Sequence, residues 1–391
     1  MSNKSVEVAP VQNSADKKAF LQLPWTIYQN DANWIPPLLA SHLGLIGFRK
    51  DAYYLRNGIQ TFLARRGDRV VGRIAAIRNQ GHLDLYNDNR GFFGFFECFD
   101  DQDAASALFD AARGWLRDQG IRNIRGPMNP SMNHEVGLLI EGFEHRPCFM
   151  MTYNPPYYQR LIEEYGFQKS QDLYAYAGFI EMLPGVLKRF SGLAEQIKER
   201  FGVRIRPMDT RHFDEEVRLF LDIYNRSISN TWGYVPMSKE ELNQEVKGLK
   251  ALLVPELVIA AEIDGRCIGA LICLPDFNPR IKAIKGKLFP FGFLRLLCFK
   301  SRIKEIRSIS ANVLPEYQMM GIPLLLLNAL VPVAEKWGIT KAEFSWVLET
   351  NEYSRGSLEK GGTVREKTYR VFDLDDVFDL DDTESQRGDL S

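Results

Sequence analysis

The sequence has few of the features that mark membrane-spanning, secreted or nucleic-acid-binding proteins. No apolar run reaches the roughly 18 residues that a spanning helix needs, and residues 1–18 are mostly polar, without an apolar segment after a basic start. We therefore expect no secretion signal and a disordered N-terminus over 1–18. The formal net charge is only -1, whereas nucleic-acid binding favours a basic surface, so no nucleic-acid partner is expected.

Cysteine and histidine are also scarce. The five cysteines are odd in number, scattered and mostly inside apolar stretches, which is typical of reduced core thiols in a cytoplasmic protein. The five histidines show no metal-ligand spacing, so the sequence predicts no metal site. What remains is the composition of a globular protein, 45% hydrophobic and 25% charged, in a chain of 391 residues that is long enough for two domains.

The predicted elements occur in the same order twice. Residues 61–77 and 257–273 each have the pattern of two strands joined by a turn that contains Gly and Asp. Asn154 and Asn351, each predicted to begin a helix, are 197 positions apart. This order predicts an α/β protein made of two copies of one unit, each a mixed, mostly antiparallel sheet flanked by helices.

The repeat also suggests where the two units lie. Gly72 and Gly269 show the same offset of 197 positions. We place the first unit at 19–185 and the second at 186–375. The stretch 376–391 is acidic and hydrophilic, which predicts a flexible tail.

The stretch from Ser308 to Pro323 is predicted to form a strand, a glycine turn and the start of a helix. Pro315 ends the strand because proline cannot donate to a ladder, and Gly321 can adopt conformations closed to other residues. Pro323 suits the first turn of a helix. The free N–H groups and positive dipole end of such a helix can bind a phosphate or pyrophosphate. The alternative is an ordinary strand, turn and helix without a ligand.

The corresponding turn of the first copy, 98–103, is chemically different. It has no glycine, and it contains the carboxylates Asp100, Asp101 and Asp103. Those carboxylates would occupy the positive helix end and repel a pyrophosphate. The second copy is therefore the predicted anion site.

The stretch Gln318-Met-Met-Gly321-Ile-Pro323, within this order of elements, resembles the turn Gln/Arg-x-x-Gly-x-Gly/Ala of the GNAT (Gcn5-related N-acetyltransferase) superfamily. Pro323 departs from that motif and removes one N–H donor. The stretches 91–97, 126–129 and 154–158 resemble a group of bacterial proteins related to N-acetyltransferases, some of which resemble bacterial ceramide synthases. The resemblance implies two tandem GNAT-like domains, one for a CoA thioester and a degenerate one on the substrate side.

The resemblance implies acetyl-CoA or a longer acyl-CoA as the co-substrate. The residues that it assigns to binding this group are Asn312, Val313, Gln318, Met319, Met320, Gly321, Ile322 and Asn351. Backbone N–H groups near the first two would polarise the thioester carbonyl. The tyrosine acid of the superfamily would fall on Leu358, so the acid for the leaving thiolate must come from elsewhere or be dispensable.

Three residues are candidates for the base that takes a proton from an acceptor amine. Glu349 follows the predicted strand 344–348, and its alternative role is that of a solvated carboxylate at a strand end. Glu135 and His134 lie in a polar cluster within the first-copy insertion 126–151, where turn formation and helix capping are the alternative. The predicted substrate-binding residues are Asn129, Asn133, Tyr153 and Tyr157; for the two tyrosines the alternative is packing.

A second insertion has an apolar stretch with mostly positively charged residues on both sides of it. Residues 280–307 include nine Lys or Arg residues and one carboxylate, Glu305, and they enclose the apolar stretch 288–299. Such a segment favours contact with an anionic membrane surface or a lipid. Core packing and contact with CoA phosphates are the alternatives.

The resemblance implies an acyl-CoA-dependent N-acyltransferase whose acceptor is an amine, and the second insertion favours a lipid or long-chain amine. We expect it in the cytoplasm, with peripheral contact to the inner membrane surface through 280–307. The alternatives are a non-catalytic protein that binds CoA or lipid, and an aminoacyl-tRNA-dependent transferase.

Overall fold

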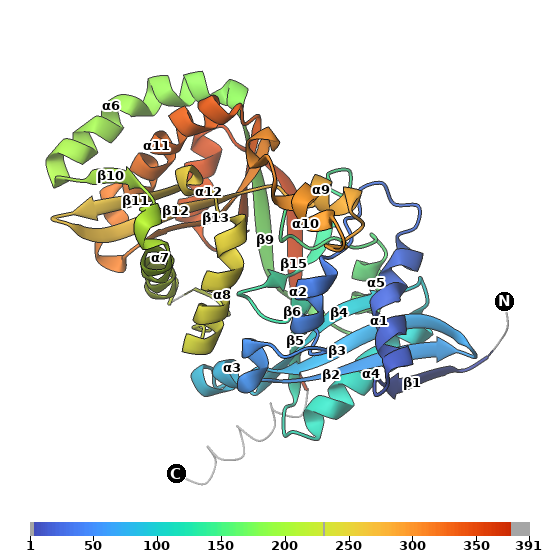
Figure 1. Ribbon diagram of the computed structural model, residues 1–391. Helices are drawn as coiled ribbons and strands as arrows, with labels where there is room; N and C mark the ends of the chain where they lie inside the picture. Colours follow the sequence, from blue (N-terminus) through green and yellow to red (C-terminus); the bar gives the residue numbers. More distant parts are fainter. Residues whose placement is uncertain (1–3, 230, 377–391) are drawn as a thin grey trace, which may run out of the picture.

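One mixed sheet runs through the molecule and joins its two halves (Figure 1). The computed structural model describes residues 4–229 and 231–376 of the chain. The strands are β1 (Val6–Pro10), β2 (Gly58–Arg66), β3 (Arg69–Arg78), β4 (Arg90–Cys98), β5 (Asn123–Gly126), β6 (Met128–Asn129), β7 (Glu135–Val136), β8 (Leu138–Glu141), β9 (Gln168–Phe179), β10 (Arg204–Pro207), β11 (Val258–Ile263), β12 (Arg266–Pro275), β13 (Glu305–Val313), β14 (Lys341–Leu348) and β15 (Val364–Leu374).

Within the described residues the large sheet has thirteen strands, in the order β1-β2-β3-β4-β5-β15-β9-β14-β13-β12-β11-β10, and β8 pairs with β15 beside this path. β6 and β7 form a separate two-stranded ribbon.

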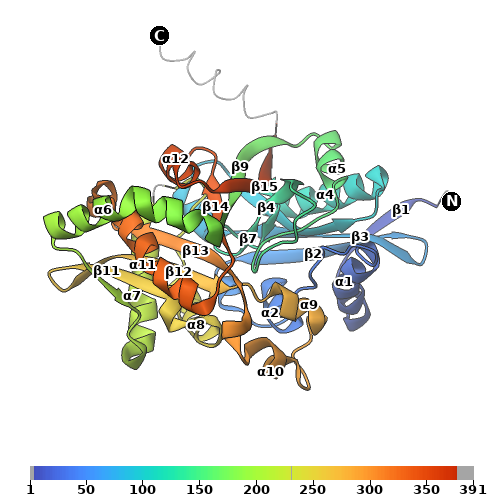
Figure 2. The same ribbon diagram turned by 90° about the horizontal axis from the view of Figure 1, so that it is seen from above.

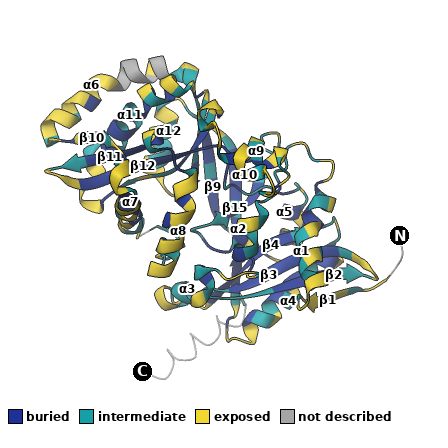
Figure 3. Ribbon diagram, in the orientation of Figure 1, coloured by how far each residue is buried: buried dark blue, intermediate teal, exposed yellow. Residues whose placement is uncertain are grey.

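Helices cover both faces of each half of the sheet (Figures 1 and 2). They are α1 (Ser14–Ile27), α2 (Leu39–Leu45), α3 (Gln80–Leu85), α4 (Gln102–Arg117), α5 (Tyr158–Glu164), α6 (Leu183–Phe201), α7 (Phe213–Ser227), α8 (Lys239–Leu252), α9 (Asn278–Ala283), α10 (Gly292–Leu297), α11 (Ile322–Trp337) and α12 (Glu352–Lys360). Buried residues lie along the strands and the inner helix faces, as Figure 3 shows. None of the helices in the described ranges combines the length and apolar character that crossing a bilayer requires.

The predicted repeat and the mixed α/β fold are confirmed. The first half contains β2-β3-β4-α4-β5-α5-β9 and the second contains β11-β12-β13-α11-β14-α12-β15. Gly72 and Gly269 occupy matching places, because an added Cβ would lie 2.7 Å from Leu108 of α4 in one case and 3.5 Å from Ile322 of α11 in the other. Both glycines therefore lie where the main helix packs closely on the sheet.

The last strand of each copy is exchanged between the two halves. β15 ends the second copy but pairs with β5 of the first, while β9 ends the first copy but pairs with β14 of the second. β15 and β9 also pair with each other, from Val364–Ala177 to Asp373–Gln168. The boundaries 19–185 and 186–375 stay a prediction that follows the chain, whereas in space each half contains one strand from the other.

The prediction that residues 1–18 are disordered is wrong for the greater part of this stretch. Val6–Pro10 form the edge strand β1, paired antiparallel with β2, and α1 begins at Ser14. Val6 and Val8 pack against the core under α4, and Asn13 caps α1 by accepting the Asp16 N–H. Alternation of two valines with polar residues is enough for an edge strand, although the segment as a whole is polar.

The predicted helix start at Asn154 is also wrong. The side chain of Asn154 accepts the Leu139 N–H at 2.7 Å and donates to the Leu139 carbonyl at 3.1 Å, as a neighbouring strand would. Two prolines follow, and α5 begins at Tyr158. Asn351, by contrast, caps α12 as predicted, with its side-chain oxygen 3.0 Å from the Ser354 N. The predicted acidic tail 376–391 lies outside the described residues except for Asp376, which pairs with Arg117.

Candidate active site

β13 and β14 are neighbours at one end only. They pair in parallel where Glu305–Ser308 meets Lys341–Phe344, and this ladder ends there. β13 then continues along β12 to Val313, after a bulge, while β14 continues along β9 to Leu348. The two strands therefore part, and backbone groups of 309–313 border the opening between them. The resemblance to the GNAT superfamily predicts that the thioester binds in this opening.

In the first copy the corresponding strands also part, but the chain itself fills the gap. β4 pairs with β5 only over Arg90–Phe92. Beyond it, the backbone of Met128 passes so close to Gly94 that an added Cβ would lie 1.7 Å from the Met128 carbonyl oxygen. The side-chain oxygen of Asn129 accepts the Phe95 N–H at 2.6 Å. The Met128 backbone therefore fills the space, and the Asn129 amide uses the backbone donor. The first copy thus has neither the room nor the free N–H that a thioester would need at this place.

The turn between β13 and α11 has the predicted glycine geometry. Gly321 has a φ of +73° and stands at the N-terminus of α11, which has no side-chain cap, and Pro323 lies in its first turn. The Gln318 side chain donates to the Val313 carbonyl at 3.2 Å and holds the turn against the end of β13. The other residues assigned here by the sequence are placed as follows: Asn312 donates to Ser310, Met319 is exposed, Met320 packs on the core and Ile322 is buried.

The matching helix end in the first copy is already occupied. Asp101 caps α4 by accepting the Ala104 N–H at 3.1 Å, and Arg66 pairs with the same carboxylate at 2.8 Å. A carboxylate and its cation thus take the place that an anion would need. Of the two equivalent helix ends, only that of α11 lacks a side-chain cap in the described structure.

The end of α7 contacts two places. One is the turn between β13 and α11, called here the anion turn, and the other is the polar cluster of the first copy at 129–135. The Tyr224 hydroxyl donates to the side chain of Asn133 at 3.2 Å. One helical turn later, the carbonyl of Ser227 accepts a hydrogen bond of 3.3 Å from Gln318. Tyr224 and Ser227 are three residues apart, a rise of about 4.5 Å along the helix axis, so the last turn of α7 contacts both the polar cluster and the turn.

The polar cluster forms part of the floor of a large cavity with a volume of about 670 Å³. Its size falls within the range of roughly 300–1,000 Å³ that is typical of ligand pockets. The apolar walls come from the loop before α2, from α8, and from the second insertion with α9 and α10; they include Ile35, Leu38, Leu249, Leu252, Ile281 and Leu297. The predicted residues Asn129, Asn133, His134, Glu135 and Tyr153 all line this one cavity.

Burial shifts the proton affinities of the two candidate bases in the floor. It raises the pKa of Glu135, and Arg307 and a hydrogen bond from Asn129 oppose this rise. It lowers the pKa of His134 to about 4, so the imidazole is neutral near pH 7, with Nδ1 2.9 Å from the Ser131 hydroxyl. A carboxyl group whose pKa is raised toward neutrality suits a general base better than an imidazole whose pKa is lowered away from it.

Arg307 forms hydrogen bonds both where β13 and β14 part and with residues that line the cavity. It lies on β13, one residue before the parallel ladder ends, and donates to Ser345 on β14 at 2.9 Å. It also donates to the carbonyls of Phe149 and Met150, at 3.0 and 3.1 Å, and both of these residues line the cavity. The positive charge of Arg307 also lowers the pKa of Glu135, so this residue of β13 acts on the cavity floor.

A second set of polar residues in the cavity was not predicted. Glu97 accepts hydrogen bonds of 2.8 Å from the hydroxyls of Tyr28 and Tyr158, and Arg73 lies 3.6 Å from the same carboxylate. The Nε2 atom of His42 is buried without a hydrogen-bond partner among the described residues, and burial lowers the pKa of His42 to about 3. A charged residue within an otherwise apolar strand, such as Arg73, was the sequence signal for this network.

Two predicted residues lie elsewhere. Glu349 accepts hydrogen bonds from the Lys169 ammonium at 2.7 Å and the Asp172 N–H at 3.0 Å, at the end of the sheet and away from the cavity lining. The hydroxyl of Tyr157 donates to the Cys98 carbonyl at 2.8 Å, so this ring packs against β4. The structure therefore brings Glu135 and His134 together in the cavity but not Glu349.

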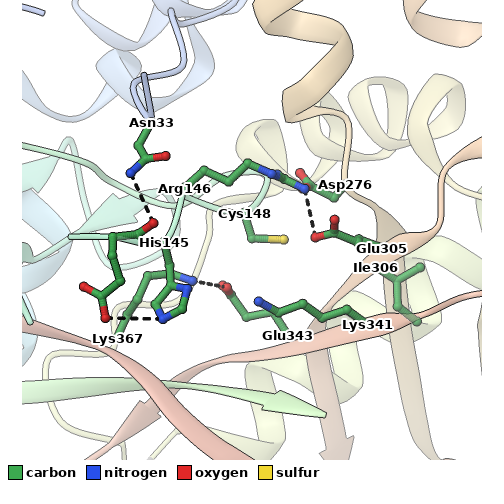
Figure 4. Close-up of a pocket in the computed structure, with 11 residues that line it drawn as sticks. Asn33, His145, Arg146, Cys148, Asp276, Glu305, Ile306, Lys341, Glu343 and Lys367 are labelled. Carbon is green, nitrogen blue, oxygen red and sulfur yellow. Dashed lines mark hydrogen bonds and ion pairs between the residues drawn. The ribbon is translucent and has the colours of Figure 1, made fainter. Parts of the chain in front are cut away.

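A smaller cavity of about 270 Å³ is polar, and its charges pair with one another (Figure 4). Lys367 lies 2.7 Å from Glu343, and Arg146 lies 2.8 Å from Glu305 and also pairs with Asp276. The two ion pairs of Arg146 connect the first half of the chain to the second. With its charges satisfied internally and few apolar walls, this cavity suits a structural role better than the binding of an acyl chain.

Comparisons with known proteins agree with this geometry. No family model matches the sequence. Over 389 residues the chain is 34% identical to bacterial ceramide synthase from Caulobacter vibrioides (strain NA1000 / CB15N), covering 95% of this chain and 98% of that protein. It is also 34% identical over 374 residues to protein YghO from Escherichia coli (strain K12), covering 92% of this chain and 93% of that protein.

Solved structures with the same fold are far more distant in sequence. A tandem GNAT protein from the clavulanic acid biosynthesis pathway superposes with a TM-score of 0.54 at 10% identity, over 95% of this chain and 98% of that one. A GCN5-related N-acetyltransferase from Sphaerobacter thermophilus gives a TM-score of 0.52 at 12% identity, over 95% of each chain. These likenesses show a tandem GNAT fold. The chain therefore belongs to the GNAT-fold, acyltransferase-like family that includes bacterial ceramide synthase and protein YghO.

Proposed function

We propose that this protein is an N-acyltransferase that moves an acyl group from a CoA thioester to the amino group of a lipid or another long-chain amine. The observation that carries the proposal is the cavity of about 670 Å³, with apolar walls and a floor that holds Glu135 and His134. Such a shape suits a molecule with a long apolar chain and one polar end. The relative named bacterial ceramide synthase makes, by its name, an N-acylated lipid, which favours the same substrate class here.

The donor belongs at the second copy. A thioester in the opening beside 309–313 could accept a hydrogen bond from the backbone, which would stabilise the oxyanion that forms during attack. The pyrophosphate would meet the N-terminus of α11 at Gly321, where the helix has no side-chain cap. Pro323 leaves this turn one N–H donor short of the superfamily motif, so we expect Gly321 and Ile322 to supply the contacts.

Glu135 is the proposed general base. An alkyl amine has a pKa near 10 and arrives as an ammonium ion, from which the Glu135 carboxylate takes one proton. The amine nitrogen then attacks the thioester carbonyl carbon, the C–S bond breaks, and the amide forms. The second nitrogen proton passes to the departing CoA thiolate. A thiol with a pKa near 8.5 leaves readily as a thiolate, which makes the missing tyrosine at Leu358 tolerable.

The direct test is thiol release by the purified full-length protein. Acetyl-CoA and long-chain acyl-CoAs are offered with a short alkyl amine or with a long-chain amino alcohol. We expect release of free CoA only with long-chain partners, and a loss of about 100-fold or more in the Glu135→Gln variant. No thiol release with any amine, together with measurable CoA binding, would exclude the enzyme.

That outcome would support a second candidate, a protein that binds CoA or a lipid without catalysis. The specific observations that favour it are Leu358 at the place of the superfamily tyrosine and Pro323 in the anion turn. Isothermal titration with CoA and with long-chain amines separates the two functions, because a binder retains both affinities when no product forms.

A further inference from the structure

The second insertion exposes several large apolar side chains close together. They lie between α9 and the short helix Lys300–Arg302, and Figure 3 shows exposed residues at α9 and α10 in this region. Monomeric proteins seldom expose a contiguous group of this kind without a partner. The side chains, called here the phenylalanine surface, are Phe289 (82% exposed), Phe291 (74%), Phe293 (40%), Leu294 (47%) and Phe299 (69%).

The backbone beneath this surface is held in place. The guanidinium of Arg280 donates to the carbonyls of Leu296, Cys298 and Phe299 at 2.9, 2.6 and 2.7 Å. The carbonyl of Gly286 accepts the Leu39 N–H at 3.1 Å, which fixes the insertion to the start of α2. The exposed rings therefore project from a supported platform, so their exposure is not the result of a loose loop.

The charges around the surface have one sign. Between Asp276 and Glu305 the sequence contains no carboxylate. Lys285, Lys287 and Arg295 are exposed and have no ionic partner in the described part of the chain. Aromatic and leucine side chains bordered by unpaired cations match the requirements of a bilayer with anionic headgroups.

The surface also borders the large cavity. Phe293 belongs to both, and its neighbours Leu288 and Leu297 line the cavity from within. Figures 1 and 2 both place α9 and α10 beside α2, whose residues form another part of the cavity wall. An object that rests on the phenylalanine surface would therefore lie at the mouth of the cavity.

We propose that the phenylalanine surface inserts into an anionic lipid bilayer and turns the cavity mouth toward it, so that a lipid can pass from the bilayer into the cavity. Binding to the bilayer stands on the exposed rings and the unpaired cations alone. Only the fate of the lipid inside the cavity rests on the proposed function.

The test uses the full-length protein without acyl-CoA, so that its result does not depend on catalysis. Flotation with vesicles of phosphatidylcholine and phosphatidylglycerol measures binding, and vesicles of phosphatidylcholine alone provide the neutral comparison. We expect the parent to float with the anionic vesicles, and Phe289→Ser/Phe291→Ser to bind at least about tenfold more weakly. The matched control is Leu55→Ser/Leu85→Ser, which removes two exposed leucines elsewhere and should bind like the parent.

The charge requirement has its own pair of variants. Lys285→Glu/Lys287→Glu/Arg295→Glu should bind anionic vesicles at least about tenfold more weakly, because each cation near such a surface contributes. Lys18→Glu/Arg204→Glu/Lys336→Glu changes the net charge equally and lies elsewhere on the molecule, so it should retain binding. A dye on Cys298, the only exposed cysteine in the described residues, should shift to the blue when vesicles are added.

Three results would overturn the proposal. The first is a parent protein that does not float with anionic vesicles, and the second is equal binding by the phenylalanine variant and its leucine control. The third is a parent that dimerises in solution without vesicle binding and becomes monomeric in Phe289→Ser/Phe291→Ser, since the surface would then join two copies of the chain. Bilayer binding with no thiol release would leave this inference standing while the proposed function fails.

Discussion

The hydroxyl of Tyr224 donates a hydrogen bond of 3.2 Å to the side-chain oxygen of Asn133, and so joins α7 of the second copy to the cavity floor formed by the first. Asn133 in turn donates to the Val235 carbonyl at 2.9 Å, in the connection that follows α7. Under the proposed function, neither copy alone would hold the acceptor near the thioester, because the floor and the anion turn come from different copies. Contacts that cross between the copies should therefore affect activity more than stability.

Removing the Tyr224 hydroxyl tests this relationship. We expect Tyr224→Phe to lower the free energy of unfolding by only about 1 kcal/mol, the usual net value of one hydrogen bond. The value of kcat/KM should fall about tenfold or more, since a small displacement of the floor misaligns the amine. Tyr234→Phe is the matched control, because it removes a hydrogen bond to Asn225 that does not involve the floor. Equal activity losses in both variants would contradict the positioning role.

Glu135 and Glu349 can be told apart by their conservative variants. We expect Glu135→Gln to lose about 100-fold or more in kcat, because it lines the cavity and can accept the amine proton. Glu349→Gln should keep its activity and lose a fraction of its stability, since its carboxylate pairs with Lys169 and accepts the Asp172 N–H. Steady-state kinetics and urea unfolding measure the two effects. The reverse assignment of losses would make Glu349 the base.

The same base predicts the direction of the pH dependence. Burial raises the pKa of Glu135 above its ordinary value near 4.5, and the carboxylate is the form that accepts a proton. Activity should therefore rise with pH until Glu135 is ionised, and this limb should be absent from the residual rate of Glu135→Gln. His134, whose pKa falls to about 4, stays neutral over this range and adds no second limb near neutrality.

Glu245, on the cavity wall, predicts a pH effect on stability. Burial, with Asp51 and Glu241 nearby, raises its pKa to about 7, so the folded protein binds more protons than the unfolded chain between about pH 4.5 and 7. Its contribution to stability is present below that window and is lost as the pH rises through about 7. We expect Glu245→Gln to be more stable than the parent at pH 8, by about 1–3 kcal/mol, with little difference at pH 4.

The comparison between parent and variant is needed because His134 acts in the opposite direction. Its folded pKa of about 4 lies below the ordinary value of 6.5, so its contribution is present at high pH and is lost as the pH falls from 6.5. Urea unfolding of both proteins at a series of pH values isolates the Glu245 contribution. A constant difference across the series would show that Glu245 is solvated.

Local features of the fold could be predicted from the sequence because they depend on neighbours in the chain. The hairpins, the glycine turn at Gly321 and the cap at Asn351 each follow from a few adjacent residues. The exchange of β9 and β15 could not be predicted in this way. Two strands of similar apolar pattern can each complete either half, and the choice is made by contacts between segments about 200 residues apart.

Only part of the candidate site could be predicted from the sequence, because the rest also depends on contacts between distant segments. Asn129, Asn133, His134 and Glu135, which line the cavity, were predicted because they are polar residues crowded into one loop. The pair Arg73–Glu97 and the hydrogen bond from Tyr28 join residues of β3, β4 and the end of α1, which are far apart in the sequence. A lone charge within a strand signals a buried partner but does not identify it.

The exchanged strands also decide how the molecule should unfold. β15 pairs with β5 over Phe372–Leu374 and with β9 along nearly its whole length, so loss of either half removes ladder partners from the other. Chains of this size with two independent domains often unfold in two steps, whereas this arrangement predicts a single transition.

Leu108→Ala in α4 and Leu326→Ala in α11, both fully buried, should each destabilise the whole protein by about 3 kcal/mol and shift the same midpoint. Circular dichroism and tryptophan fluorescence, followed in urea with the exposed Leu55→Ala as the control, measure this. Two separate midpoints, of which each variant moves only one, would show that the halves unfold independently in spite of the shared strands.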